Sequence, residues 1–257
     1  MSNLIRMEFY KLRYNLLYWL ALLGMVIFGF TDAQEYIDFA SYSTVKWDDI
    51  AVTSFSGLYN SMTADSLIFV TLMAGLIAFT IGREFSLRTL SSEVASGLNR
   101  RDIFVSKAIV NILAYDLLMI AHPLGGMVKG ILHYGVGDLP DNILNVLRTS
   151  IYIFIIYSAV FMCSVLIAYI FRNGIVAGIV SAALWFVLAY VFAMLCNTDL
   201  TAINMLLPFY HCRKILDVGS SLHGGRIIDI PAILCSVIWV SVCSIITWRA
   251  FKKADLK

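Results

Sequence analysis

The chain has 257 residues, of which 60% are hydrophobic and 14% are charged, and its mean hydropathy is +0.82. Soluble domains are about half apolar and about a quarter charged, so this composition excludes an ordinary soluble protein and indicates a membrane protein. The formal net charge of +2 gives no reason to expect a nucleic-acid partner. The positions of the charges along the chain are more informative than their sum.

Six stretches are long and apolar enough to cross a membrane as helices, since about 20 residues span about 30 Å of hydrocarbon. Their apolar residues are continuous and do not alternate, which excludes the strands of a membrane barrel. We therefore predict an all-α membrane protein with a single domain over residues 1–257. The predicted spans are Tyr14–Thr31, Met62–Gly82, Ile103–Leu132, Thr149–Phe171, Gly174–Leu195 and Ile230–Trp248.

The basic residues predict the orientation of these spans. Thirteen of the 19 lysine and arginine residues fall at the two termini and in the segments that follow the second and fourth spans. Cytoplasmic segments of membrane proteins are enriched in these residues. The loop after the first span is instead acidic. We therefore expect both termini in the cytoplasm.

The third span contains the features that most suggest a special role. Pro123, followed by two glycines, predicts a kink or break, because proline removes a backbone hydrogen bond. Asp116 and His122 lie in or near the membrane, where ionisable groups are costly and often functional. Six positions apart, they do not share a helix face. Two interpretations stay open: a polar group facing a neighbouring helix with a second group near the interface, or a role in a substrate path.

Small residues recur at four-residue spacing in three of the spans: Ala78 and Gly82, Gly126 and Gly130, and Gly174, Gly178 and Ala182. This spacing lets helix backbones approach closely, so we read it as a packing signal.

The external segment before the last span is only half polar. Its stretch "LTAINMLLPFY", Leu200–Tyr210, predicts a re-entrant helical element in the outer leaflet. Cys196 and Cys212 flank this segment; we interpret the cysteines as packing residues, with a bridge between these two as the alternative.

Several catalytic motifs are missing from the sequence. There is no phosphate-binding loop of the Gly-x-x-x-x-Gly-Lys-Ser/Thr type, no His-Glu-x-x-His zinc helix and no Gly-x-Ser-x-Gly nucleophile elbow. The cysteines and histidines show no metal-ligand spacing. We therefore predict no catalytic residue, no metal site and no cofactor bound by this chain, which is not an enzyme by itself.

A basic, helix-prone segment separates the second and third spans. In it Leu87, Leu90, Val94 and Leu98 recur at three- and four-residue steps and share a helix face. Gly97 suits the helix end, and Asn99 is a candidate cap for the third span. The pattern predicts a short amphipathic helix along the inner membrane surface.

Three stretches together resemble the membrane subunits of type-2 ABC exporters: "MEFYKLRYN" before the first span, "REFSLRTLSSEVASGLNRRDIFVSK" after the second, and the ending "WRAFKKADLK". The residues of the middle stretch that fit the family pattern are Glu84, Thr89, Leu90, Arg100, Arg101 and Lys107. Arg88 departs from the pattern, because the family often has glycine there.

The resemblance implies a mechanical role in transport. In such exporters two membrane subunits, identical or different, pair in the bilayer, and each rests on a separate ATPase subunit that binds ATP and Mg. The coupling helix that contacts the ATPase would correspond to Glu84–Asn99, with Arg88 and Glu93 as its main polar contacts and Glu84, Arg100 and Arg101 beside them.

Membrane lipids and a multi-pass place in a bacterial cell membrane are also implied. The resemblance favours outward movement of an amphipathic or hydrophobic substrate, a peptide or an antibiotic, as in the small peptide and bacteriocin-immunity exporters. The alternative is a membrane enzyme or a stand-alone immunity protein that binds its ligand through the external loops.

Overall fold

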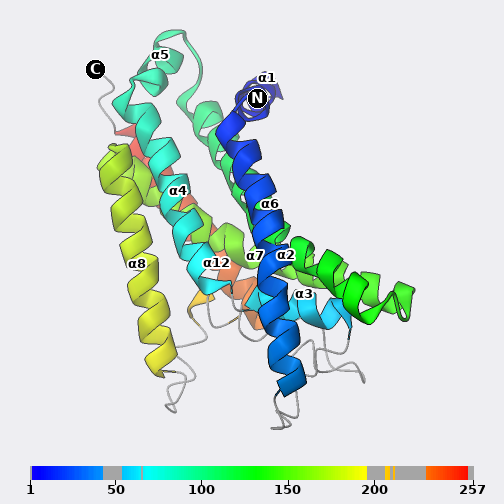
Figure 1. Ribbon diagram of the computed structural model, residues 1–257. Helices are drawn as coiled ribbons and strands as arrows, with labels where there is room; N and C mark the ends of the chain where they lie inside the picture. Colours follow the sequence, from blue (N-terminus) through cyan, green and yellow to red (C-terminus); the bar gives the residue numbers. More distant parts are fainter. Residues whose placement is uncertain are drawn as a thin grey trace.

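The computed structural model describes residues 2–42, 54–64, 66–195, 206–208, 211 and 230–253. Within these residues every regular element is an α-helix (Figure 1). The helices are α1 (Ser2–Arg13), α2 (Leu16–Tyr42), α3 (Phe55–Ala64), α4 (Leu67–Ser86), α5 (Thr89–Ala95), α6 (Arg100–Tyr134), α7 (Leu139–Phe171), α8 (Gly174–Leu195) and α12 (Ile230–Lys252).

Five of these helices, α2, α4, α6, α7 and α12, are long and apolar enough to cross a membrane. The predicted span Gly174–Leu195 coincides with α8, whose 22 residues measure about 33 Å at 1.5 Å per residue. The stretch Gly174–Ala189, whose side chains the structure describes, is apolar but shorter than a membrane span. The all-helical membrane fold is therefore confirmed with five spans, and the sixth stays a prediction.

Two helices, α2 and α7, extend ten residues or more beyond the predicted spans. Helix α2 continues past Thr31 through acidic residues that we had assigned to a loop, and Gln34 Nε2 donates to Asp38 Oδ1 at 2.8 Å along its surface. Helix α7 begins ten residues before the predicted Thr149. Charged residues mark the end of the apolar stretch, but a helix can continue beyond it because its backbone is already paired internally.

Helix α3 was not predicted, since its polar residues placed it in the external loop. It packs against α6 and α7. Phe55, Leu58, Tyr59 and Met62 are all buried, at most 2% exposed. Their spacing of three and four residues is the helical pattern that could have identified this element.

Helix α6 runs without interruption through Pro123, so the predicted break is absent. The ribbon changes direction in the second half of the helix (Figure 1). With 35 residues, α6 is about 52 Å long, well above the thickness of the hydrocarbon layer.

Two helix pairs pack closely at glycines. Between α4 and α8, a Cβ on Gly82 would lie 2.9 Å from the Cα of Gly174. Between α2 and α6, a Cβ on Gly29 would lie 1.9 Å from the backbone oxygen of His122. The first pair confirms the packing role expected of the small residues of these two spans.

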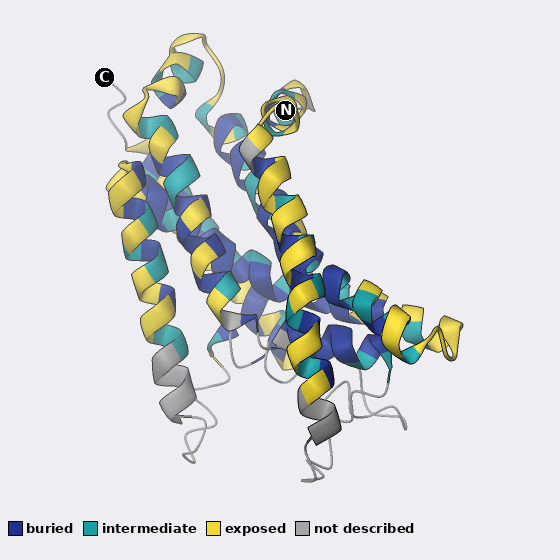
Figure 2. Cartoon of the chain, in the orientation of Figure 1, coloured by how far each residue is buried: buried dark blue, intermediate teal, exposed yellow. Residues whose placement is uncertain are grey.

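Helix α7 forms the centre of the bundle. In its most apolar stretch 72% of the residues are buried, against 22% in that of α2 (Figure 2). Tyr157, Phe161 and Tyr169 of α7 are among the largest fully buried side chains. Large apolar side chains are exposed on α2, α8 and α12. This is the distribution expected of helices that face lipid or another membrane subunit.

Helix α1, the last turn of α12 and helix α5 lie at one end of the bundle (Figure 1). Arg100, in the first turn of α6, donates from Nη1 to the backbone oxygens of Phe251 and Lys252 at 3.2 Å each, which joins α6 to the last turn of α12. This agrees with termini on the same side of the membrane; that this side is cytoplasmic stays a prediction.

Some predictions concern residues that the structure does not describe. They are the predictions for Cys196, for Cys212 and for most of Leu200–Tyr210. Of that segment the structure describes residues 206–208, where Leu206 accepts a hydrogen bond from Trp239 Nε1 of α12 at 2.9 Å.

Candidate functional site

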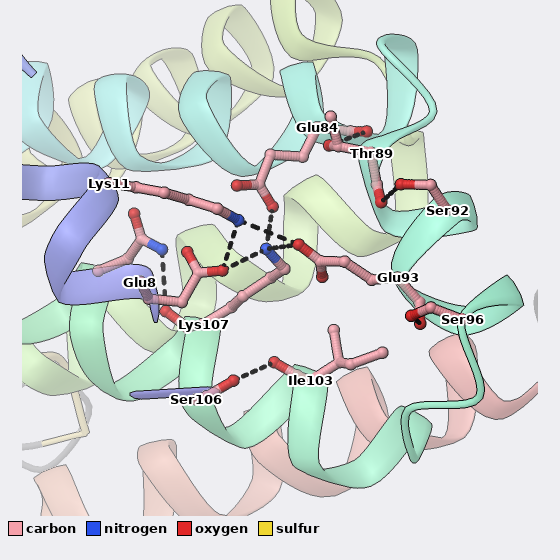
Figure 3. A network of polar contacts seen from close by, with 11 residues as sticks. Glu8, Lys11, Glu84, Thr89, Ser92, Glu93, Ser96, Ile103, Ser106 and Lys107 are labelled. Carbon is pink, nitrogen blue, oxygen red and sulfur yellow. Dashed lines mark hydrogen bonds and ion pairs between the residues drawn. The ribbon is translucent and has the colours of Figure 1, made fainter. Parts of the chain in front are cut away.

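A buried lysine is the centre of the most highly charged site in the described structure. Lys107 is 1% exposed, yet its ammonium group contacts three carboxylates (Figure 3). Nζ lies 2.8 Å from Glu8 Oε1, 2.8 Å from Glu84 Oε2 and 3.1 Å from Glu93 Oε1. Removing a charge from water costs several kcal/mol, so such a lysine is stable only when it is paired in this way.

Each carboxylate comes from a different helix. Glu8 lies on α1, Glu84 in the last turn of α4 and Glu93 on α5, while Lys107 lies in the second turn of α6. Lys11 of α1 completes the group, with Nζ 2.7 Å from Glu8 Oε1 and 3.0 Å from Glu93 Oε1. We call these five residues the Lys107 cluster. It joins four helices at the end of the bundle where α5 lies.

The inward faces of the two short helices explain how they deliver their carboxylates. On α1, Leu4 and Glu8 are one turn apart and both buried. On α5, Leu90 is buried and Val94 half-buried on the same side as Glu93. Apolar residues therefore seat each helix and bring its glutamate to Lys107.

The predicted coupling helix is shorter than Glu84–Asn99. Helix α4 ends at Ser86 and α5 at Ala95, so Leu87 and Leu98 lie outside α5 and are exposed, at 60% and 37%. The helix therefore does not bury all four leucine and valine residues of the expected apolar face. Gly97 has φ of 87° and ends the segment as predicted.

The turn between α4 and α5 has an unusual backbone. Arg88 adopts φ 56° and ψ 17°, in the left-handed region where glycine is favoured. Type-2 ABC exporters, which the sequence resembles, often have glycine at this position, and glycine suits this conformation. Arginine adopts it at a cost of about 1–2 kcal/mol, and its side chain is exposed at the end of the bundle.

The charges of the Lys107 cluster do not balance, because three carboxylates face two ammonium groups. Burial raises the pKa of Glu8, but the attraction and hydrogen bonds of Lys107 and Lys11 outweigh it, so the pKa lies below its ordinary value of 4.5. Glu93 Oε2 is buried and has no hydrogen-bond partner among the described residues.

The structure thus brings together two of the five predicted coupling residues, Glu84 and Glu93. Arg88 is exposed on the turn, Arg101 is exposed in the first turn of α6, and Arg100 contacts the end of α12. That these residues contact an ATPase stays a prediction. Asn99 is the N-cap of α6 as predicted, although its side chain makes no capping hydrogen bond.

The sequence analysis missed Glu8, Lys11 and Lys107 as members of one site. A lysine placed only a few residues into an apolar span was a signal for Lys107, since such a group needs a partner. The pairing of Glu8 with Lys11 at i,i+3 was a signal within α1. Nothing local in the sequence indicated that these groups meet.

Asp116 and His122 lie apart, on different sides of α6. Asp116 is fully buried and accepts a hydrogen bond at Oδ2 from Ser158 of α7 at 3.0 Å; its Oδ1 has no hydrogen-bond partner among the described residues. His122 faces α2, with Nε2 3.3 Å from Asp32 Oδ2. Its ring lies 4.6 Å from that of Phe69, centre to centre. Neither placement assigns a substrate path, which stays a prediction.

The ion pairs of the Lys107 cluster join helices to one another. Within the described ranges no group of three or more His, Cys, Asp or Glu residues is placed to hold a metal ion. Glu93 fixes α5 to α1 and to α6 through ion pairs of 3.0 and 3.1 Å, and Lys107 of α6 also pairs with Glu84 of α4 at 2.8 Å. Displacement of α5 therefore acts on α1, α4 and α6 together.

Comparison with known proteins identifies the family. A family profile described as ABC-2 family transporter protein matches residues 4–194, from α1 nearly to the end of α8, and so includes the whole Lys107 cluster. The comparison with curated proteins finds no match. Because the profile covers more than half of the chain, the protein belongs to the ABC-2 transporter family and is a membrane subunit of an ABC transporter.

Proposed function

We propose that this chain is the membrane-spanning subunit of an ABC exporter in a bacterial cell membrane. A separate ATPase subunit supplies the energy, and a second membrane subunit, identical or related, completes the pair. The substrate moves outward and is amphipathic or hydrophobic, with a peptide or an antibiotic as the two candidates. Family membership supports the membrane-subunit role, and an ABC ATPase partner follows from it in general.

The Lys107 cluster is the observation that carries the coupling part of this proposal. The exposed surface at this end of the bundle includes Leu87, Arg88, Thr89 and Ser92, from the α4–α5 turn and the outer side of α5. We assign the ATPase contact to this surface, with Arg88 as its main cation. On the inner side of α5, Glu93 passes the displacement to Lys107 and Lys11.

Nucleotide binding can shift the transporter between two states only if the ATPase contacts those states differently. We assign this role to α5, which is ion-paired directly to α1 and α6 and is linked to α4 through Lys107, so its displacement is passed to the spans. Tilting of α4 and α6 then opens the path outward.

The interior of the bundle supports the proposed substrate class. Outside the Lys107 cluster, the buried acidic, basic or histidine side chains of the described residues are Asp116, His122 and His211. An amphipathic substrate with few charges suits such a path better than a highly charged one. Asp116 and Ser158 are the groups that we place on the path.

Purification from native membranes tests the coupling assignment. We expect an ATPase to co-elute with the chain and to be lost from the double variant Arg88→Gly, Glu93→Gln, together with ATP turnover that depends on the membrane subunit. Glycine is the appropriate replacement for Arg88, because it removes the side chain without straining the left-handed backbone.

Arg172→Gly is the matched control. Arg172 is exposed, has φ 53° and follows α7 at the same end of the bundle, so it shares the backbone conformation and charge of Arg88. The control should keep the ATPase. Retention of both association and ATP turnover by the double variant would contradict the assignment, and absence of any ATPase would favour the membrane-enzyme or immunity alternative.

A further inference from the structure

The outer side of α1 carries an exposed stripe with a distinctive composition. Arg6, Phe9, Tyr10 and Arg13 recur at three- and four-residue steps and are all exposed, so they share one face; Tyr14, directly after α1, is also exposed and its backbone N donates to Tyr10 O at 3.2 Å. Phe9, Tyr10 and Tyr14 are 44%, 62% and 67% exposed. The rings of Tyr10 and Tyr14 lie 4.5 Å apart, centre to centre. We call these five residues the outer stripe.

The outer stripe leads directly into a surface of α2 suited to lipid. Helix α1 lies across the end of the bundle and is seen nearly end-on, while α2 descends from it (Figure 1). Trp19 of α2 donates from Nε1 to the backbone oxygen of Arg13 at 2.9 Å. Beyond it Leu16, Leu20 and Leu23 of α2 are more than half exposed. The stripe therefore lies where a membrane span meets the membrane surface.

We infer that the outer stripe binds the headgroups of anionic phospholipids in the leaflet at this end of the bundle. Tyrosine and tryptophan prefer the headgroup level, where an apolar ring body and a polar tip are both satisfied. Arginine forms paired hydrogen bonds with phosphate oxygens. The cytoplasmic leaflet carries anionic lipid, which attracts such residues, so the inference rests on the orientation in the proposed function.

The opposite face of α1 connects this lipid contact to the Lys107 cluster. Glu8, on that face, is 5% exposed and binds both Lys107 and Lys11. A lipid-bound α1 holds Glu8 against Lys107 and thereby keeps α5 in place. Anionic lipid is thus a requirement for full coupling between ATP turnover and transport, and neutral lipid supports less of it.

Lipid binding by the purified full-length chain tests the inference without any ATPase. The probe is phosphatidylglycerol, titrated into phosphatidylcholine micelles and followed by native mass spectrometry. The double variant Arg6→Gln, Arg13→Gln should bind phosphatidylglycerol about 30-fold more weakly, since each arginine near an anionic surface contributes about 1 kcal/mol. Added salt should weaken binding by the unchanged chain and affect the variant less.

The control is Arg101→Gln, Arg172→Gln, which removes two exposed arginines from the same end of the bundle. It should keep phosphatidylglycerol binding within about threefold, and a thermal unfolding curve establishes that both variants are folded. Equal losses in the two double variants, or no loss in either, would overturn the inference. Unchanged lipid binding with lost co-elution of an ATPase would also overturn it, because the stripe would then bind protein.

Because the lipid titration contains no ATPase, it can fail while the proposed coupling role stands. The co-elution test of the coupling role can likewise fail while lipid binding by the outer stripe stands.

Discussion

Replacing Lys107 with methionine should be among the most destabilising single changes in the protein. Methionine keeps most of the side-chain volume but removes the charge that lies within 2.8–3.1 Å of three carboxylates. Removing one partner of a buried ion pair costs about 3–5 kcal/mol, because the remaining charges stay buried without compensation. We expect a loss in this range, since Lys107 is 1% exposed and Lys11 alone would then face Glu8, Glu84 and Glu93.

The assay is reversible unfolding in mixed micelles with increasing SDS, followed by tryptophan fluorescence. Lys11→Met is the matched control, because Lys11 contacts the same oxygens of Glu8 and Glu93 at 2.7 and 3.0 Å while its side chain is 43% exposed. Solvent screens such a pair, so the control should lose less than about 1 kcal/mol.

A double-mutant cycle identifies the cause of the loss. Adding Glu8→Gln to Lys107→Met removes one uncompensated carboxylate and should recover about 1–3 kcal/mol. If Lys107→Met and Lys11→Met cost the same, or if Glu8→Gln adds its own penalty in full, the cluster does not act through buried charge and the reasoning fails.

Three further predictions concern packing, pH and topology. Gly29→Ala should destabilise the protein by about 1–3 kcal/mol or more, because its Cβ would lie 1.9 Å from a backbone oxygen of α6. Gly24→Ala is the control: its Cβ would have no other atom within 4 Å, so the same unfolding assay should show no change or a slight stabilisation. The pKa of Glu8 in the folded protein lies below 4.5, so the stabilisation that Glu8 provides is present above about pH 4.5 and is lost as the pH falls through the folded pKa. The free energy of unfolding should therefore change less between pH 7 and pH 3.5 in Glu8→Gln than in the unchanged chain. In a chain without its native cysteines, Asp48→Cys should react with an impermeant reagent from outside and Ser92→Cys only after permeabilisation, and reaction of both from one side would contradict the orientation.

The apolar spans could be predicted because their signal is local and long. The predicted Ile230–Trp248 lies within α12, and Gly174–Leu195 has the bounds of α8. Hydrophobic content does not define helix ends, however, which explains why α2 continues past Thr31 and α7 begins before Thr149. For α6 a kink or a break was predicted at Pro123: the helix is unbroken there, since a long membrane helix tolerates proline when neighbouring groups compensate the lost hydrogen bond, and its ribbon changes direction in the second half (Figure 1).

The candidate site was only partly predictable, for a physical reason. Glu84 and Glu93 were singled out because the resemblance to type-2 ABC exporters implies a coupling helix at Glu84–Asn99. The partner of both, Lys107, lies 14 residues beyond Glu93, and Glu8 lies 99 residues before Lys107. Ion pairs over such separations depend on how four helices pack against one another, and a local pattern of apolar residues does not predict that packing. The amphipathic pattern likewise could not reveal that the chain turns at Leu87 and Arg88.

The glycine contacts described above divide the bundle into stiff parts. At Gly82 and Gly174 the backbones of α4 and α8 touch, and at Gly29 and His122 those of α2 and α6 do. Neither pair has room for one helix to slide along the other, because a side chain would have to pass through a backbone. We therefore expect opening and closing to occur by rocking of these two helix pairs, with a transported molecule passing between them.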